Sequence, residues 1–219
     1  MNITNTIENN ERLIEAAMTN NNDAVQRLVG VSDPSYAEYE ALGWALRNNN
    51  AENVRAVLSA THSNDTSGVV KRFKTAKNLR VDVLKIIVEY LHNAFKDGSE
   101  HKQQEIERVV LFMAEKAIDQ HNTSALQYLV HHCDPNASNG NLLRAAAVSG
   151  HEDMITVLYP LSNPEKTTEA MEEYIKITRP SPNMTLGIAR IRERMEQEKL
   201  YRNLSEAVDG SSGEHKRKM

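Results

Sequence analysis

The sequence has few of the residues that build cross-linked or sheet-rich folds. Its one cysteine, Cys133, excludes an intramolecular disulfide and a zinc site made of several thiolates of one chain. Aromatic residues make up 5% of the chain, and the apolar residues are mostly Leu, Val, Ile, Ala and Met, which suit packed helices better than a β-sandwich. With only 9 glycines and 6 prolines, the chain also favours long helices over tight-turned sheets.

Long apolar runs and an excess of positive charge are also missing. No run approaches the roughly 20 residues that cross a bilayer, and the first residues lack the basic start and apolar core of a signal peptide. We therefore expect a soluble, cytoplasmic protein, and a lone cysteine fits a reducing compartment. The net charge of −4 argues against a general nucleic-acid binder, which needs a basic face.

What the sequence does contain is an internal repeat. Three segments begin with an Ala-rich helix, continue through a polar turn, and end in a second helix with apolar residues at i, i+3 and i+4. They are LIEAAMTNNNDAVQRLV from Leu13, LGWALRNNNAENVRAVL from Leu42 and LRAAAVSGHEDMITVLY from Leu143. The aligned positions are a small residue (Ala16, Ala45, Ala146), a turn residue (Asn20, Asn49, Gly150) and an inward triplet (Val25/Leu28/Val29, Val54/Val57/Leu58, Ile155/Leu158/Tyr159).

Two weaker copies fill the middle of the chain. One places Thr75 at the small position, followed by Leu84, Ile87 and Val88; the other has Ala117, followed by Leu126, Leu129 and Val130. A polar insertion at about 92–108 separates them, and it is either a binding loop or an added helix.

The spacing has a physical explanation. Small residues let paired helices approach closely, the triplets bury a stripe, and Asn or Gly tolerates the left-handed backbone that ends a helix. Because one pair cannot bury its own apolar face, stacking of the pairs must stabilise the array. The sequence thus predicts an all-α solenoid of about five helical hairpins over residues 1–162.

Several of these residues resemble ankyrin repeats. SGHEDMITVLYPL is similar to the second half of such a repeat, and CDPNASNGNLLRAAAVSGH to its loop and first helix, with Asp134-Pro135-Asn136 at the start of the loop. The resemblance covers roughly residues 10–162 and implies a stack of ankyrin-like hairpins that binds another protein. The Thr-Pro-Leu-His motif is absent from every copy, which predicts short or irregular loops and leaves a generic hairpin solenoid as the alternative.

The repeat pattern stops after Pro160. We expect a helical cap over 163–208, made of helices at 164–178 and from Met184 to about Val208, followed by a disordered tail at 209–219. The candidate apolar positions of the last helix are Leu186, Ile188, Ile191, Met195, Leu200 and Leu204.

Residues capable of chemistry are scattered. His131, His132, Cys133 and Asp134 are metal-binding types, but adjacent side chains diverge and no second cluster completes a tetrahedral site. Motifs for phosphate, dinucleotide, zinc-hydrolase or serine-hydrolase sites are absent. We therefore expect no enzyme, no cofactor and no metal, with an unrecognised catalytic site near Glu172 and Glu173 as the alternative.

One dense basic patch stands out, made of Lys71, Arg72, Lys74, Lys77 and Arg80 on the first helix of the third copy. It is either a solvated helix face or a surface for an anionic partner, including nucleic acid or anionic lipid. The acidic segments EAMEEYIKI and RERMEQEK are either salt-bridged helix faces or similar to the Glu-rich translocation signals of bacterial effectors, which act in the cytosol of a host cell.

The function that these observations favour is non-catalytic binding of another protein through the repeat surface. A narrower form of this hypothesis is a secreted bacterial effector that binds a host protein. The single tryptophan, Trp44, is either part of the core or a binding hot spot. The candidate contact residues are Tyr36, Tyr39, Trp44, Arg47, Asn48, Lys71, Arg72, Lys74, Asn78, His121, Asn139 and Arg144.

Overall fold

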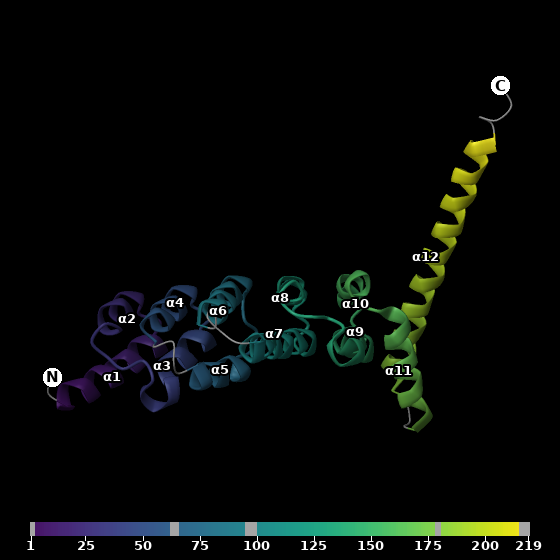
Figure 1. Cartoon of the computed structure of the whole chain (residues 1–219). Coiled ribbons are helices and arrows are strands. Elements are labelled where there is room, and N and C mark those ends of the chain that lie inside the picture. The colour runs from purple at the N-terminus through teal and green to yellow at the C-terminus, as the bar shows by residue number, and fades with distance from the viewer. Residues whose placement is uncertain (1–2, 62–65, 95–99, 178–180, 215–219) are drawn as a thin grey trace. The chain divides into compact units, whose positions relative to one another are not determined.

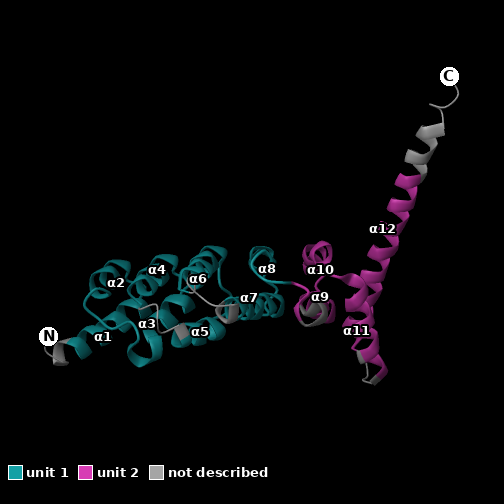
Figure 2. Cartoon of the chain, viewed as in Figure 1, with its two compact units in different colours: residues 1–134 teal, residues 135–219 magenta. Residues whose placement is uncertain are grey.

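The chain is helical wherever its structure is described. A computed structural model describes residues 3–61, 66–94, 100–177 and 181–214, and these residues contain helices and turns but no strand (Figure 1). The all-α prediction is confirmed for this part of the chain. The residues form two compact units, 1–134 and 135–219 (Figure 2), so the predicted array of 1–162 spans both units.

The first unit contains four pairs of helices in two layers. Its helices are α1 (Ile3–Met18), α2 (Asn22–Leu28), α3 (Tyr36–Arg47), α4 (Ala51–Ala60), α5 (Thr66–Thr75), α6 (Val81–Ala94), α7 (Glu100–Asp119) and α8 (Thr123–Leu129). In one layer α1 packs on α3, α3 on α5 and α5 on α7, and in the other α2 packs on α4, α4 on α6 and α6 on α8 (Figure 1). Each pair therefore stabilises its neighbour rather than a common centre.

The predicted small residues and triplets make up much of the core. Ala16, Ala45 and Ala117 are buried at the positions where the two layers meet. The triplets of α4, α6 and α8 are buried throughout. In the first copy only Val25 is fully buried, because Leu28 and Val29 lie on the outermost pair and remain half-buried.

The turns between paired helices follow one local rule. Asn20, Asn49 and His121 adopt left-handed backbone angles, with φ of 60°, 51° and 52°. The next residue is Asn21, Asn50 or Asn122, and its side chain accepts a hydrogen bond from the backbone N–H three residues later. Asparagine tolerates the left-handed region and is a favoured N-cap, so the Asn-rich turns both end one helix and begin the next.

The third copy departs from the predicted register. Thr75 was expected at the small buried position, but it is exposed, and Phe73 is buried instead with 1% of its surface exposed. Helix α5 ends at Thr75, so Lys77 and Arg80 lie in the following turn and not on the helix that was expected to carry the whole basic patch.

The insertion of about 92–108 falls largely within helices. Helix α6 continues to Ala94 and α7 begins at Glu100, so the inserted residues lengthen both flanking helices. Residues 95–99 lie outside the described part of the chain.

The second unit is built around α9. It contains α9 (Ala137–Ser149), α10 (Glu152–Leu158), a 3₁₀ turn η1 (Tyr159–Leu161), α11 (Pro164–Ile177) and α12 (Pro182–Glu214). Helix α9 packs on α10, α11 and α12. The approach of α12 is close, because a Cβ added at Gly187 would lie 2.5 Å from the carbonyl oxygen of Ala147.

Only the first part of α12 buries its apolar residues. Met184, Ile188 and Ile191 are buried, whereas Leu186, Leu200 and Leu204 are 48%, 59% and 54% exposed. The helix is assigned as far as Glu214, beyond the predicted start of the tail at 209, and residues 215–219 lie outside the described part. Among the described helices, none has the length and apolar character needed to cross a membrane.

Candidate functional site

The first unit contains a groove of about 780 Å³. Its walls are the C-terminal halves of α3 and α5 and the turns that follow them. The residues from α3 and its turn are Glu40, Gly43, Trp44, Leu46, Arg47 and Asn49, and those from α5 and its turn are Arg72, Thr75, Ala76, Lys77 and Asn78. Both polar and apolar residues line this groove, as they do in protein-binding sites.

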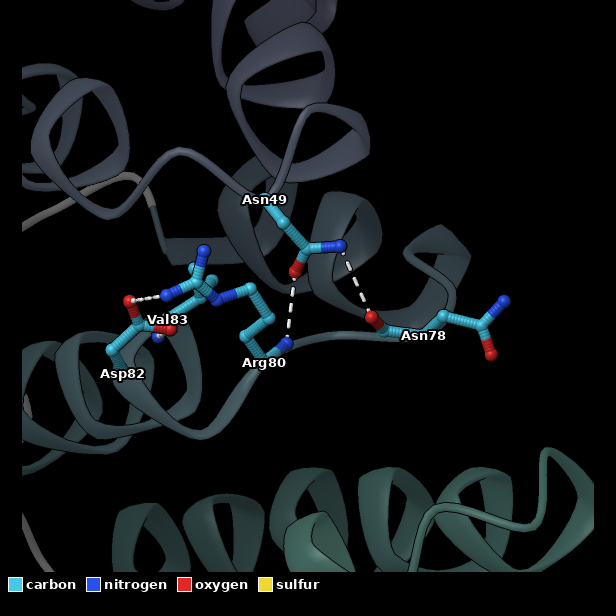
Figure 3. Close-up of polar contacts among 5 residues, drawn as sticks. All are labelled: Asn49, Asn78, Arg80, Asp82 and Val83. Carbon is cyan, nitrogen blue, oxygen red and sulfur yellow. Dashed lines mark hydrogen bonds and ion pairs between the residues drawn. The ribbon is translucent and has the colours of Figure 1, made fainter.

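The side chain of Asn49 joins the two turns that border the groove (Figure 3). Its Nδ2 donates to the carbonyl oxygen of Asn78 at 3.0 Å, and its Oδ1 accepts from the backbone N–H of Arg80 at 2.8 Å. Asn49 and Asn78 both have φ of 51°. Because each end of one amide is bonded to the next turn, the two turns are fixed relative to each other before any ligand arrives.

Other amides extend the same connection along the unit. Asn48 donates from Nδ2 to the carbonyl oxygen of Ala17 at 2.9 Å, so this candidate contact residue holds the preceding turn. Asn122 donates from Nδ2 to Leu79 O at 3.1 Å, and Gln120 Oε1 accepts from Asn78 N at 2.6 Å. The turns therefore form a chain of hydrogen bonds from pair to pair, which we call the amide ladder.

Part of the basic patch has a structural role. The first residues of α3, Ala37, Glu38 and Tyr39, have left-handed φ angles of 49°, 55° and 63°, a conformation that costs roughly 1–2 kcal/mol per residue. Arg72 donates from Nε to the carbonyl oxygen of Glu38 at 2.6 Å and from Nη2 to that of Ala37 at 3.1 Å. These two bonds connect the irregular start of α3 to α5.

Glycine and a second cation complete this contact. A Cβ at Gly43 would lie 3.3 Å from Arg72 Nη1, so the bare α-carbon leaves room for the arginine to cross α3. Lys71 Nζ lies 2.6 Å from Glu38 Oε2, and the hydrogen bond from Lys71 lowers the pKa of the Glu38 carboxyl. Both side chains are exposed, so this pair contributes little to stability.

Two further cations of the patch, Lys74 and Lys77, are available to a ligand. Lys74 and Lys77 are exposed and, within the described residues, neither belongs to an ion pair. Arg47 is also exposed, and its guanidinium lies 4.4 Å from the centre of the Trp44 ring. This cation–π contact orients both side chains at the groove, where Trp44 is half-buried.

The groove brings together four of the candidate contact residues, namely Trp44, Arg47, Arg72 and Asn78. Tyr39 is not on a free surface, because it is 3% exposed and its ring fills the space beside Gly68. Tyr36 is half-buried at the start of α3, and His121 is exposed in the α7–α8 turn. Sequence reasoning missed Asn49 as a site residue, although its repeat position marked it as a turn.

Two candidates belong to the second unit. Arg144 is half-buried on α9, and Asn139 lies on the same helix with a side chain outside the described set. Neither residue is part of the groove of the first unit.

The His131–Asp134 segment follows α8. Burial raises the pKa of the Cys133 thiol to about 12, with a smaller contribution from Asp134, so the thiol is protonated and poorly nucleophilic at neutral pH. Burial lowers the pKa of His132, whose ring lies 4.8 Å from that of Tyr128. Among the described residues, no three His, Cys, Asp or Glu side chains converge as metal ligands.

Comparison of the chain with protein-family models, with curated proteins and with solved structures finds no match.

Proposed function

We propose that this protein is a non-catalytic, ankyrin-like binding module whose protein partner occupies the groove between α3 and α5. The observation that carries the proposal is the position of the single tryptophan, half-buried in a groove of about 780 Å³ with Arg47 against its ring. Tryptophan and arginine are the residues most enriched at the energetic centres of protein interfaces.

The rigidity of the groove supports the same proposal. Asn49 fixes both bordering turns, and Arg72 fixes the start of α3 against α5. A surface that is already ordered loses less conformational entropy when a partner binds, which favours affinity. The mixture of one aromatic ring, free cations and amides suits recognition of a polypeptide, which presents both apolar and polar groups.

The repeat geometry supports the ankyrin-like part of the proposal. The left-handed turn residues Asn20, Asn49, His121 and Gly150 stand at equivalent positions, each two residues before the second helix of its pair. A left-handed residue at the same place in four turns is consistent with the repeat on which the ankyrin resemblance of the sequence is based.

Site-specific photo-cross-linking tests the proposal. A photoreactive phenylalanine at Thr75, which is exposed on the groove wall, is compared with one at Lys85, which is exposed on α6 away from it. We expect the probe at Thr75 to form a defined adduct in cell lysate that the probe at Lys85 does not form. We also expect Trp44→Ala to reduce the adduct at least tenfold, as the loss of a hot spot does.

Adducts of equal yield from both positions, or from neither, would contradict the proposal. A variant with Arg55→Gln, on α4, controls for loss of a surface charge outside the groove.

A further inference from the structure

The groove carries an imbalance of charge. Three cationic side chains line it, Arg47, Arg72 and Lys77, and Glu40 is the acidic one. The C-terminal ends of α3 and α5 each contribute about half a negative charge. Three positive charges, less one for Glu40 and about one for the two helix ends, leave about one positive charge.

The cations around the groove differ in whether they already have partners. Lys71 is paired with Glu38, Arg80 with Asp82 at 2.9 Å, and Arg72 with two backbone carbonyls. Arg47 and Lys77 line the groove without a carboxylate partner among the described residues, and Lys74 is likewise unpaired on the last turn of α5. Their charges are free to meet an incoming anion.

The groove also offers groups that suit a polypeptide backbone. Both backbone groups of Asn78 are used, its N–H by Gln120 and its carbonyl by Asn49. Its exposed side chain points away from Asn49 and Arg80 (Figure 3), and its amide carries one donor and one acceptor for a peptide group. The half-buried Trp44 ring provides apolar surface in the same groove.

These features favour a peptide over a nucleic acid. Nucleic-acid affinity comes from many phosphate contacts, whereas the groove has few free cations and the whole chain has a net charge of −4. A short acidic segment needs only two or three carboxylates near Arg47 and Lys77, with an apolar residue against Trp44.

On the basis of the proposed function, we infer that the partner inserts an extended acidic segment into this groove. Its Asp or Glu side chains meet Arg47 and Lys77, its backbone bonds the Asn78 amide, and an apolar side chain packs on Trp44.

Selection from a library of displayed random peptides, with the immobilised full-length chain as the target, tests this inference. We expect selected peptides to be enriched in Asp and Glu around one apolar residue. Trp44 is the chain's single tryptophan and lines the groove. Titration with a synthetic copy of the best peptide should therefore change the fluorescence of Trp44 until the groove is saturated. Arg47→Gln and Lys77→Gln should each weaken binding about threefold to fivefold, because exposed charge pairs are individually weak.

Control variants and other ligands show which results would contradict the inference. Arg55→Gln and Lys85→Gln remove exposed cations from α4 and α6 and should leave the affinity unchanged. Neutral or basic peptides that shift Trp44 fluorescence equally well would overturn the acidic partner and leave the protein-binding proposal standing. Tighter binding of polyuridylate or phosphatidylserine vesicles, or no shift with any probe, would overturn this inference, and the cross-linking experiment would then decide the proposed function separately.

Discussion

The turn after α3 and the turn after α9 share one backbone shape but are held in different ways. Asn49 has φ of 51° and uses its own side chain to bond the next turn. Gly150 has φ of 77° and no side chain, and its carbonyl accepts a hydrogen bond from Arg190 of α12 at 3.2 Å. Arg190 also lies 3.3 Å from Glu152, in the first turn of α10. One turn is thus completed by another repeat-like turn, and the other by a long helix.

This difference shows that similar left-handed turns do not by themselves determine which element packs against them. A left-handed residue ends the first helix in both places, but the neighbour that satisfies the turn determines whether the surface stays open. In the first unit the neighbour is another turn, and a groove remains beside it. In the second unit α12 packs on α9 and lies against Gly150 through Asn183.

The largest effect is expected at the contact that brings α12 onto α9. Gly187→Ala would place a Cβ 2.5 Å from a backbone oxygen and 2.7 Å from Ala147 Cβ, neither of which can move freely. We expect the second unit to lose about 2–3 kcal/mol of stability, because overpacking outweighs the gain in helix propensity. Urea unfolding measures the change, and Gly30→Ala, with no atom within 4 Å, is the control. Equal unfolding midpoints for the two variants would contradict the close approach.

An effect of comparable size is expected at Asn49. Asn49→Ala removes two hydrogen bonds and places a residue with a Cβ but no amide in a left-handed conformation, a loss of about 2–3 kcal/mol. Asn49→Gly keeps the backbone conformation and should lose only about 1–2 kcal/mol. Gly150→Asn should lose about 1 kcal/mol, because φ of 77° strains a residue with a Cβ although that Cβ would meet Asn183 at an ordinary 3.5 Å.

Those three variants are compared by denaturant unfolding of the full chain. If Asn49→Gly were as stable as the unchanged protein, the side-chain bonds of Asn49 would contribute nothing and the comparison of the two turns would fail.

A gain of stability is expected at Asn53 of α4. Its side chain is fully buried, and among the described residues neither its amide nitrogen nor its oxygen has a hydrogen-bond partner. The equivalent positions of the other second helices hold Ala24, Val83, Ala125 and Met154. Asn53→Ala should therefore stabilise the first unit by about 1 kcal/mol, because an unsatisfied buried amide is removed. A lower melting temperature for this variant would show that the amide is satisfied in solution.

The smallest effect at neutral pH is expected at Tyr159 in the second unit. Burial, together with Glu198, raises the pKa of its hydroxyl from 10.0 to about 12. Because the folded pKa lies above the unfolded value, the neutral hydroxyl stabilises the unit below pH 10, and this contribution is lost as the pH rises towards 12. Tyr159→Phe should flatten the alkaline unfolding profile between these values while changing little at pH 7. An unchanged profile would assign the alkaline loss to another group.

The repeat pattern was predictable because its rules are local. Asn or Gly at a left-handed turn and a buried triplet on the next helix follow from backbone sterics and helical spacing. Thr75 was misplaced because the choice between Thr75 and Phe73 depends on what α3 and α7 present to α5, which no local pattern encodes. The left-handed start of α3 was equally hidden, since Ala37, Glu38 and Tyr39 are not residues that favour such angles.

Part of the site was predictable from residue type alone. Trp44 and Arg47 were identified by residue type, and the groove holds both. The sequence did not predict which cations of the patch already have partners. Lys71 and Arg72 are bound by groups at the start of α3, whereas Lys74 and Lys77 are not, and this difference depends on the irregular backbone of that helix start.

The amide ladder also has a consequence for how the first unit opens. Each turn is bonded to its neighbour, so unfolding of one pair of helices removes hydrogen bonds from the next pair. Local unfolding should therefore begin at an end of the unit and propagate from pair to pair. Among the described helices, α1 and α2 pack on one neighbouring pair, α3 and α4, and Leu28 and Val29 at the end of α2 are half-buried. The amide protons of this N-terminal pair should therefore exchange with solvent well before those of the α3–α5 groove. The binding surface then stays folded while the end of the array unfolds locally.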